Sequence, residues 1–187
     1  MISLQCVNEM TEEEFVRSMS VCYNGSSTKA PAFATFALQQ AFLAKPFASR
    51  DALFRALTAP LIFGERDAVV ALLRDREPLG NKRPDASEHL PEWEKRSNAE
   101  HASVGLHRLA QDEFDLMADL NRRYRDKHGF TFIIRAAGRS KPEIIERLTT
   151  RLANATEDEV AIAVRQYSEI IGLRLKDIVA CNEHEAR

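Results

Sequence analysis

Hydrophobic residues recur every three or four positions along most of this chain, which is the spacing of one face of an α-helix. Residues that begin helices precede several of these stretches: Thr11 with Glu14, Ser49, Ser140, and Thr156 with Glu159. The pattern predicts helices over about 11–22, 32–44, 50–58, 65–74, 98–110, 112–128, 140–152 and 157–180. Gly129 stands where a C-cap glycine would end the helix of 112–128.

Two stretches lack the helical pattern. Residues 75–96 hold three of the seven prolines and many charges, which predicts a long surface loop. The apolar run Phe130-Thr131-Phe132-Ile133-Ile134 has the composition of a strand but no partner strand elsewhere, so we expect a buried extended segment. The predicted fold is therefore all-α: a single-domain bundle of about eight helices over 1–187, with one short extended segment near 130–136.

Composition narrows the class of protein. The chain has 187 residues, 44% of them hydrophobic and 29% charged, with a formal net charge of −2, as in an ordinary globular domain. That charge argues against general nucleic-acid binding, and no apolar run approaches the length of a membrane span. Cys6, Cys22 and Cys181 have no zinc-ligand or redox spacing, so we expect no metal site and a cytoplasmic protein.

The final predicted helix carries one charge against its pattern. Residues spaced four, three, four, three and four apart place one face of it inward: Val160, Val164, Tyr167, Ile171, Arg174 and Ile178. A guanidinium on such a face needs a carboxylate or an anionic ligand, because an unpaired buried charge is costly. Arg174 is thus either a structural ion pair, an Arg whose head reaches water, or a binding residue.

Ser97, Glu100 and His101 form a second candidate group. Ser97 and Glu100 lie three residues apart near the start of a predicted helix, so they share a face of it. The same Ser-x-x-Glu spacing is that of a capping box, which is the structural alternative. His101 follows directly and has a side chain that titrates near neutrality.

Several short motifs occur in order between about residues 7 and 180 and together resemble one family. They are Val7-Asn8-Glu9-Met10, Lys45-Pro46-Phe47-Ala48-Ser49, Ser97-x-x-Glu100-His101, Leu120-Asn121-x-x-Tyr124-x-x-Lys127-His128-Gly129-Phe130-x-Phe132-Ile133-Ile134, Arg151-Leu152-x-Asn154 and Leu173-Arg174-Leu175. In this order they resemble the 2-oxo-4-hydroxy-4-carboxy-5-ureidoimidazoline (OHCU) decarboxylases of urate breakdown.

The resemblance implies an all-helical, cofactor-free carboxy-lyase, a homodimer, that converts OHCU to (S)-allantoin with loss of carbon dioxide. Its substrate is a small anionic ureidoimidazoline. Arg174 would face the anionic or carbonyl edge of the ring, and Glu100 would accept hydrogen bonds from its N–H groups. Ser97 and the main chain of Phe132, Ile133, Ile134, Arg135 and Ala136 would complete the substrate-binding cradle.

The chain departs from the family at three of these positions. Arg76 takes the place of the family's His in its His-Pro-x-Leu motif, and a second alignment, through Arg83, also puts an Arg there. An Arg stays protonated near neutrality, so Arg76 cannot exchange a proton as that His would, although it can hold a carboxylate. His101 replaces the family's Gln, and Arg135 replaces a small residue or Cys.

Two hypotheses of different class follow. In the first, the protein is a decarboxylase in which His101, beside Glu100, has taken over proton transfer and Arg76 assists as a third catalytic residue. In the second, it is a family member without this activity that binds another small anionic metabolite or acts as a non-catalytic partner. Ser97, Glu100 and Arg174 are present in either case and predict a ligand pocket.

Overall fold

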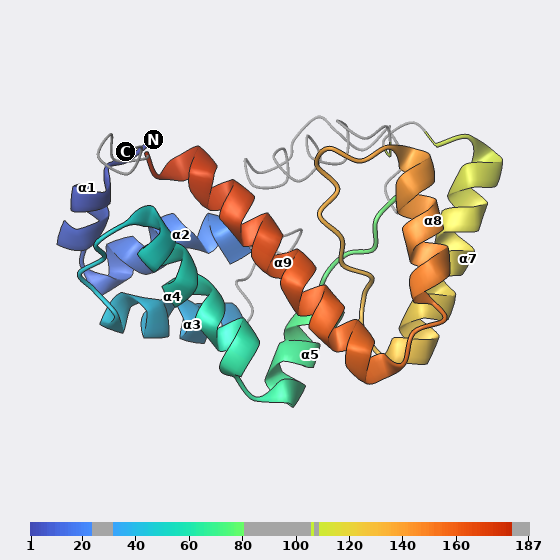
Figure 1. Ribbon diagram of the computed structural model, residues 1–187, viewed down its shortest axis with the longest axis horizontal. Coiled ribbons are helices and arrows are strands. Elements are labelled where there is room, and N and C mark those ends of the chain that lie inside the picture. Colours follow the sequence, from blue (N-terminus) through green and yellow to red (C-terminus); the bar gives the residue numbers. More distant parts are fainter. Residues whose placement is uncertain (24–31, 81–105, 107–108, 181–187) are drawn as a thin grey trace. The chain divides into compact units, whose positions relative to one another are not determined.

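The computed structural model describes residues 1–23, 32–80, 106 and 109–180 (Figure 1). These residues form eight helices: α1 (Leu4–Glu9), α2 (Glu12–Tyr23), α3 (Ala32–Leu43), α4 (Arg50–Phe63), α5 (Arg66–Arg74), α7 (Gln111–His128), α8 (Lys141–Arg151) and α9 (Thr156–Ile178). Within them there is no β-sheet, and one isolated bridge pairs Ile2 with Val179. The all-α class is confirmed. In the part of the chain that the structure describes, no helix is long and apolar enough to span a bilayer.

The chain divides into two compact units. The described residues of unit 1 are 1–23, 32–69 and 167–180, and those of unit 2 are 70–80, 106 and 109–166. Helices α5 and α9 contribute residues to both units. Each unit has its own buried apolar side chains. A single domain over 1–187 stays a prediction.

Unit 1 packs α2, α3 and α4 around aromatic side chains. Phe15 of α2 is fully buried, with its ring centroid 5.8 Å from that of Phe42 and 6.1 Å from that of Phe47. The C-terminal part of α9 joins this core, because the Tyr167 hydroxyl donates to the Tyr23 carbonyl at 2.5 Å. The predicted helices over 11–22 and 32–44 are confirmed here as α2 and α3.

Motif residues of unit 1 hold the fold together. The Asn8 side chain donates to the Phe47 carbonyl at 2.9 Å and accepts from the Phe47 amide at 2.8 Å. Ser49 caps α4 by accepting from the Ala52 amide, as predicted. Helix α4 runs beyond the expected end near residue 58, because Leu53, Leu57 and Leu61 continue one buried stripe. Helix α1 was not predicted, and Ser3 caps it.

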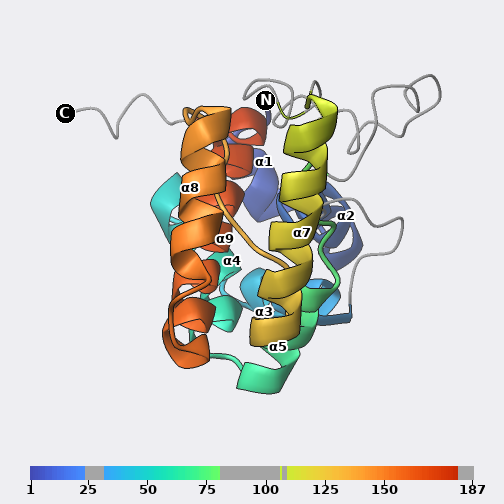
Figure 2. The same ribbon diagram turned by 90° about the vertical axis from the view of Figure 1, so that its right-hand side faces the viewer.

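Unit 2 is built on two helices, α7 and α8, that lie side by side and run in the same direction (Figures 1 and 2). Lys141, at the start of α8, donates to Glu113, at the start of α7, at 2.6 Å. Lys127, near the end of α7, donates to the Leu152 carbonyl just beyond α8 at 2.6 Å. Parallel neighbours need a connection that returns along the helix length, and residues 129–140 supply it.

Three expectations need correction or lie outside the described residues. The surface-loop prediction for 75–96 is wrong for Arg76, Leu79 and Gly80, which are buried. The reason is long-range: the Asn121 side chain donates to the Leu79 carbonyl, and Thr131 donates to the carbonyl of Arg76. The predicted helix over 98–110 falls almost wholly outside the described residues. The segment 130–136 contains neither helix nor turn and is mostly buried, as predicted.

The inward face of α9 is only partly as predicted. Tyr167, Ile171 and Arg174 are buried, whereas Val160, Val164 and Ile178 are partly exposed. Their places are taken by Glu159, Ala163 and Leu175, each buried. The buried residues of α9 therefore recur every four positions from Glu159 to Leu175. The face begins at Glu159 because polar partners hold this side chain inward.

Candidate functional site

The buried segment 130–136 of unit 2 is the centre of the candidate site. Phe130 and Phe132 are 0% and 2% exposed, and both rings meet the Tyr124 ring edge-on, at centroid distances of 5.8 and 5.2 Å. Edge-to-face contacts of this kind stabilise aromatic clusters beyond the area that they bury. Helix α7, which carries Tyr124, thus anchors the first half of the segment.

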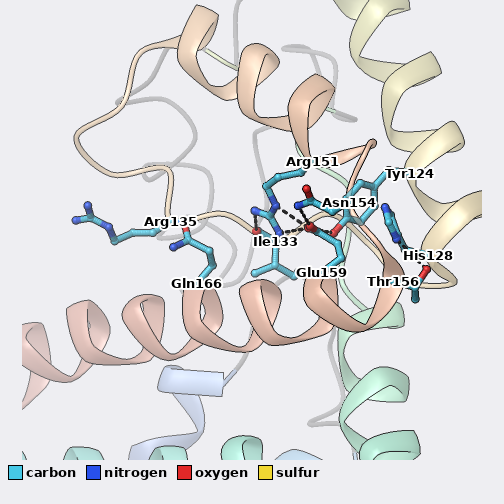
Figure 3. A network of polar contacts seen from close by, with 9 residues as sticks. All are labelled: Tyr124, His128, Ile133, Arg135, Arg151, Asn154, Thr156, Glu159 and Gln166. Carbon is cyan, nitrogen blue, oxygen red and sulfur yellow. Dashed lines mark hydrogen bonds and ion pairs between the residues drawn. The ribbon is translucent and has the colours of Figure 1, made fainter.

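A polar cluster around Glu159 holds the middle of the segment (Figure 3). Glu159 is 0% exposed and forms an ion pair with Arg151. Its Oε1 atom accepts from Arg151 Nε at 2.6 Å and from the Tyr124 hydroxyl at 2.5 Å, and its Oε2 atom accepts from Asn154 Nδ2 at 2.7 Å. Both oxygens are therefore satisfied, as a buried carboxylate requires.

Glu159 was expected to cap the last helix with Thr156, and this prediction is wrong. Helix α9 begins at Thr156 itself, and the Glu159 amide bonds the carbonyl of Ala155. The Thr156 hydroxyl instead contacts His128 Nδ1 at 3.2 Å. A carboxylate in the first turn of a helix can cap it when the carboxylate is exposed to water. Here the carboxylate is buried, because it accepts from three donors in α7, α8 and the turn after α8.

Arg151 connects the cluster to the main chain of the segment. Its Nη1 atom donates to the Ile133 carbonyl at 2.8 Å, and its guanidinium carbon lies 4.5 Å from the centroid of the Phe132 ring. A guanidinium presents its donors in a fixed planar fork, so the bonds to Glu159 also fix the donor that reaches Ile133. Burial, together with the hydrogen bond to Glu159, raises the pKa of Tyr124, which stays a neutral donor.

Further contacts anchor both ends of the segment. The Thr131 amide donates to the Leu73 carbonyl at 3.4 Å, and its hydroxyl donates to the Arg76 carbonyl at 2.8 Å. At the other end, the Arg135 amide donates to the Gln166 side chain at 3.1 Å. The segment is thus tied to α5, α8 and α9 without belonging to a sheet.

Some main-chain groups of the segment have no hydrogen-bond partner in the described part of the chain. Among the residues that the structure describes, the amides and carbonyls of Phe132 and Ile134 make no hydrogen bond, and neither does the amide of Ala136. Buried amide and carbonyl groups nearly always have partners in folded proteins. A segment that offers donors and acceptors in this way is suited to bind a small ring with both kinds of group on its edges.

The predicted site residues divide into three sets. Ser97, Glu100 and His101 lie outside the described residues. Arg76 is 8% exposed in unit 2, directly after α5, and its carbonyl bond with Thr131 brings it beside the segment 132–136. Arg174 is 6% exposed in unit 1, so its predicted inward position is confirmed, while its role in binding or in an ion pair stays a prediction.

Sequence reasoning singled out neither Glu159 nor His128 as part of the site's surroundings. Tyr124, Arg151 and Asn154 were noticed only as motif residues, without a role. The sequence signal for these three residues was their place in the motifs. Patterns within one helix do not reveal their contacts, because the contacts join residues up to 35 positions apart. Figure 3 also shows the Arg135 side chain pointing away from the Glu159 cluster. Among the described residues, no group of three or more His, Cys, Asp or Glu side chains could hold a metal ion.

The described residues define an all-helical protein with a buried non-helical segment, and the comparisons identify its family. The profile described as OHCU decarboxylase matches residues 8–176. The chain therefore belongs to the OHCU decarboxylase family.

Relatives of known name share this assignment. The chain is 26% identical over 177 residues to 2-oxo-4-hydroxy-4-carboxy-5-ureidoimidazoline decarboxylase of Halalkalicoccus jeotgali, covering 95% of this chain and 92% of the relative. It is 26% identical over 179 residues to the uric acid degradation bifunctional protein of Bacillus subtilis, covering 96% of this chain but 33% of that protein. The chain thus spans about a third of the bifunctional relative.

Two solved structures share the fold. A crystal structure of (S)-allantoin synthase superposes with a TM-score of 0.69 at 17% identity, over 96% of this chain and 54% of the other. A crystal structure of OHCU decarboxylase in the presence of (S)-allantoin gives a TM-score of 0.62 at 19% identity, over 77% of this chain and 90% of the other. At these identities the likeness is one of fold.

Proposed function

We propose that this protein is a carboxy-lyase that converts OHCU to (S)-allantoin and carbon dioxide in urate degradation, without a cofactor. Membership of the OHCU decarboxylase family supports the proposal. The observation that carries it is the buried segment 132–136, in which the amides and carbonyls of Phe132 and Ile134 make no hydrogen bond among the described residues. A ureidoimidazoline ring has N–H and carbonyl groups that complement such a row.

The charged residues are assigned by the chemistry of the substrate. Arg174 offers a planar pair of donors to the anionic or carbonyl edge of the ring. Glu100 accepts from ring or ureido N–H groups, and Ser97 adds a hydroxyl. Arg76, beside the segment through the Thr131 hydroxyl, supplies a permanent positive charge for the carboxylate that leaves.

Proton transfer requires a different residue. When the bond to the carboxylate breaks, its electron pair stays on the substrate, and one proton must replace the carbon dioxide that leaves. An Arg side chain keeps its proton near neutrality, so it cannot deliver this one. His101 titrates near neutrality and follows Glu100 directly, so it is the proposed donor.

Freshly generated OHCU tests the proposal. Circular dichroism should show (S)-allantoin forming faster with purified protein than spontaneously. His101→Gln should abolish this acceleration, and Arg174→Met should raise KM while the far-ultraviolet spectrum stays that of a folded protein. A wild-type rate equal to the spontaneous rate would contradict the decarboxylase proposal and favour a family member that binds another anionic metabolite.

A cytoplasmic homodimer is part of the proposal. The chain has a mass of 21.1 kDa, so light scattering coupled to size-exclusion chromatography should give about twice that value. A monomeric mass at micromolar concentration would contradict the dimer. Fractionation of cells that express the native protein should place it in the cytoplasmic fraction.

A further inference from the structure

We propose that Tyr124, Arg151, Asn154 and Glu159 form a positioning cluster that sets the main chain of residues 132–136 for substrate. None of the four is among the residues assigned to substrate above. The inference rests on the proposed function, because it names what fixes the geometry of the proposed binding segment. The four residues come from α7, α8, the turn after α8, and α9, and Figure 3 shows them meeting at the Glu159 carboxylate.

Among the described residues, the side chains of the cluster bond to one another and make one side-chain hydrogen bond outward, to the segment. Glu159 is 0% exposed, and its two oxygens take donors from Tyr124, Arg151 and Asn154. The remaining directed contact leaves the cluster from Arg151 Nη1 to the Ile133 carbonyl at 2.8 Å. A guanidinium that is bonded to a buried carboxylate in this way holds its outward donor in one place.

Hydrogen bonds from the segment to the helices fall at alternate residues. The structure ties the main chain at Thr131, Ile133 and Arg135, each through a bond to α5, α8 or α9. In an extended chain, the amide and carbonyl of one residue point to the same side, and those of the next residue point to the opposite side. Fixing the odd-numbered positions on one side therefore directs the amides and carbonyls of Phe132 and Ile134 to the other side, where they are free among the described residues.

Arg151 restrains a side chain of the segment as well as a carbonyl. Its guanidinium lies 4.5 Å from the Phe132 ring centroid, and the same ring meets Tyr124 at 5.2 Å. Phe132 is therefore held between two members of the cluster. Both the rotation of the Ile133 peptide and the position of the preceding residue depend on where Glu159 holds Arg151.

Deletion of one hydroxyl tests the cluster with little change in volume. Tyr124→Phe removes the donor to Glu159 and keeps the ring contacts with Phe130 and Phe132. Tyr167→Phe is the matched control: it removes a buried hydroxyl that donates to the Tyr23 carbonyl in unit 1, outside the cluster. Arg151→Lys and Arg151→Met form a second pair, since Lys keeps the charge and one donor whereas Met keeps only the length.

The expected result is a change in substrate binding with the chemical step preserved. Tyr124→Phe should raise the KM for OHCU about tenfold with kcat within about twofold of wild type, because a displaced binding segment weakens ground and transition states alike. Partial unfolding would instead lower the apparent kcat and leave KM unchanged. Arg151→Lys should recover part of the KM that Arg151→Met loses, and Tyr167→Phe should leave KM unchanged.

Amide hydrogen exchange provides a readout that needs no turnover. In Tyr124→Phe, exchange of the peptide covering 130–136 should be at least about fivefold faster than in wild type, and it should be unchanged in Tyr167→Phe. Equal exchange in the two variants would overturn the positioning role, as would equal KM values. A wild type that does not accelerate OHCU breakdown would refute the proposed function, and the exchange comparison would still decide the positioning role.

Discussion

His128 and Glu159 are two buried ionisable residues that contact the same tyrosine, and they are stabilised in different ways. Glu159 accepts from the Tyr124 hydroxyl and is compensated by Arg151, so its charge has a partner. The His128 ring lies 4.6 Å from the Tyr124 ring, and its Nε2 atom has no hydrogen-bond partner among the described residues. Burial lowers the pKa of His128, which favours the neutral ring.

The folded state should therefore lose stability as the pH falls through the unfolded value of His128, about 6.5. The depressed pKa means that the unfolded chain binds the proton more readily, so protonation favours unfolding. His128→Phe should remove this dependence. Urea denaturation at pH 7.5 and 5.5 measures the free energy of unfolding, which should fall less in the variant than in wild type at the lower pH. An equal fall in both proteins would contradict this role for His128.

At the scale of elements, unit 2 depends on the return of the chain between two parallel helices. Gly129 ends α7 with φ +79°, and its amide bonds the Arg125 carbonyl at 2.8 Å. That conformation is unfavourable for residues with a Cβ atom, so glycine is the residue that ends the helix with least strain. The sharp end of α7 is what starts the segment 130–136 on its return toward the beginning of α8 (Figures 1 and 2).

Gly129→Ala should lower the free energy of unfolding by about 1 kcal/mol, because Ala is strained in the left-handed region. A Cβ atom at this position meets nothing within 4 Å, so no steric clash adds to the effect. Gly129→Asn should cost less, since Asn tolerates this conformation better. Urea denaturation of the two variants at pH 7.5 measures the difference, and an Ala variant as stable as wild type would contradict the argument.

At the scale of the whole molecule, helix N-termini in both units are held by carboxylates. Glu14 in unit 1 accepts from the Thr11 amide at 2.9 Å, and Glu143 in unit 2 accepts from the Ser140 amide at 2.7 Å. Glu113 accepts from Lys141 and from the Ala110 amide. These hydrogen bonds lower the pKa of all three carboxyl groups.

Acid should consequently destabilise the protein in a second step, distinct from that of His128. A lowered carboxyl pKa gives stability that is present above the unfolded value of about 4.5 and is lost as the pH falls through the folded value. Denaturation midpoints between pH 5.5 and 3.5 should fall less steeply in a Glu14→Gln/Glu143→Gln variant than in wild type. Equal slopes would show that these caps do not contribute to the acid response.

Local sequence was sufficient to predict the helices and some of their caps. Ser49, Ser140 and Thr11 act on groups three residues away, so neighbouring residues determine them. The buried run 130–134 could be recognised by its composition and lack of a partner strand. Arg174 was expected inward from the spacing of α9, and it is buried.

Only the tertiary structure decided which charges are buried and what holds the segment 130–136. Glu159 has the sequence position of a capping residue, yet it is buried because it accepts from donors in α7, in α8 and in the turn after α8. Arg76 was placed in a surface loop, yet its carbonyl is bound by Thr131, 55 residues away. The free energy of burying a charge depends on partners that are distant in sequence, so the pattern of a single element cannot predict it.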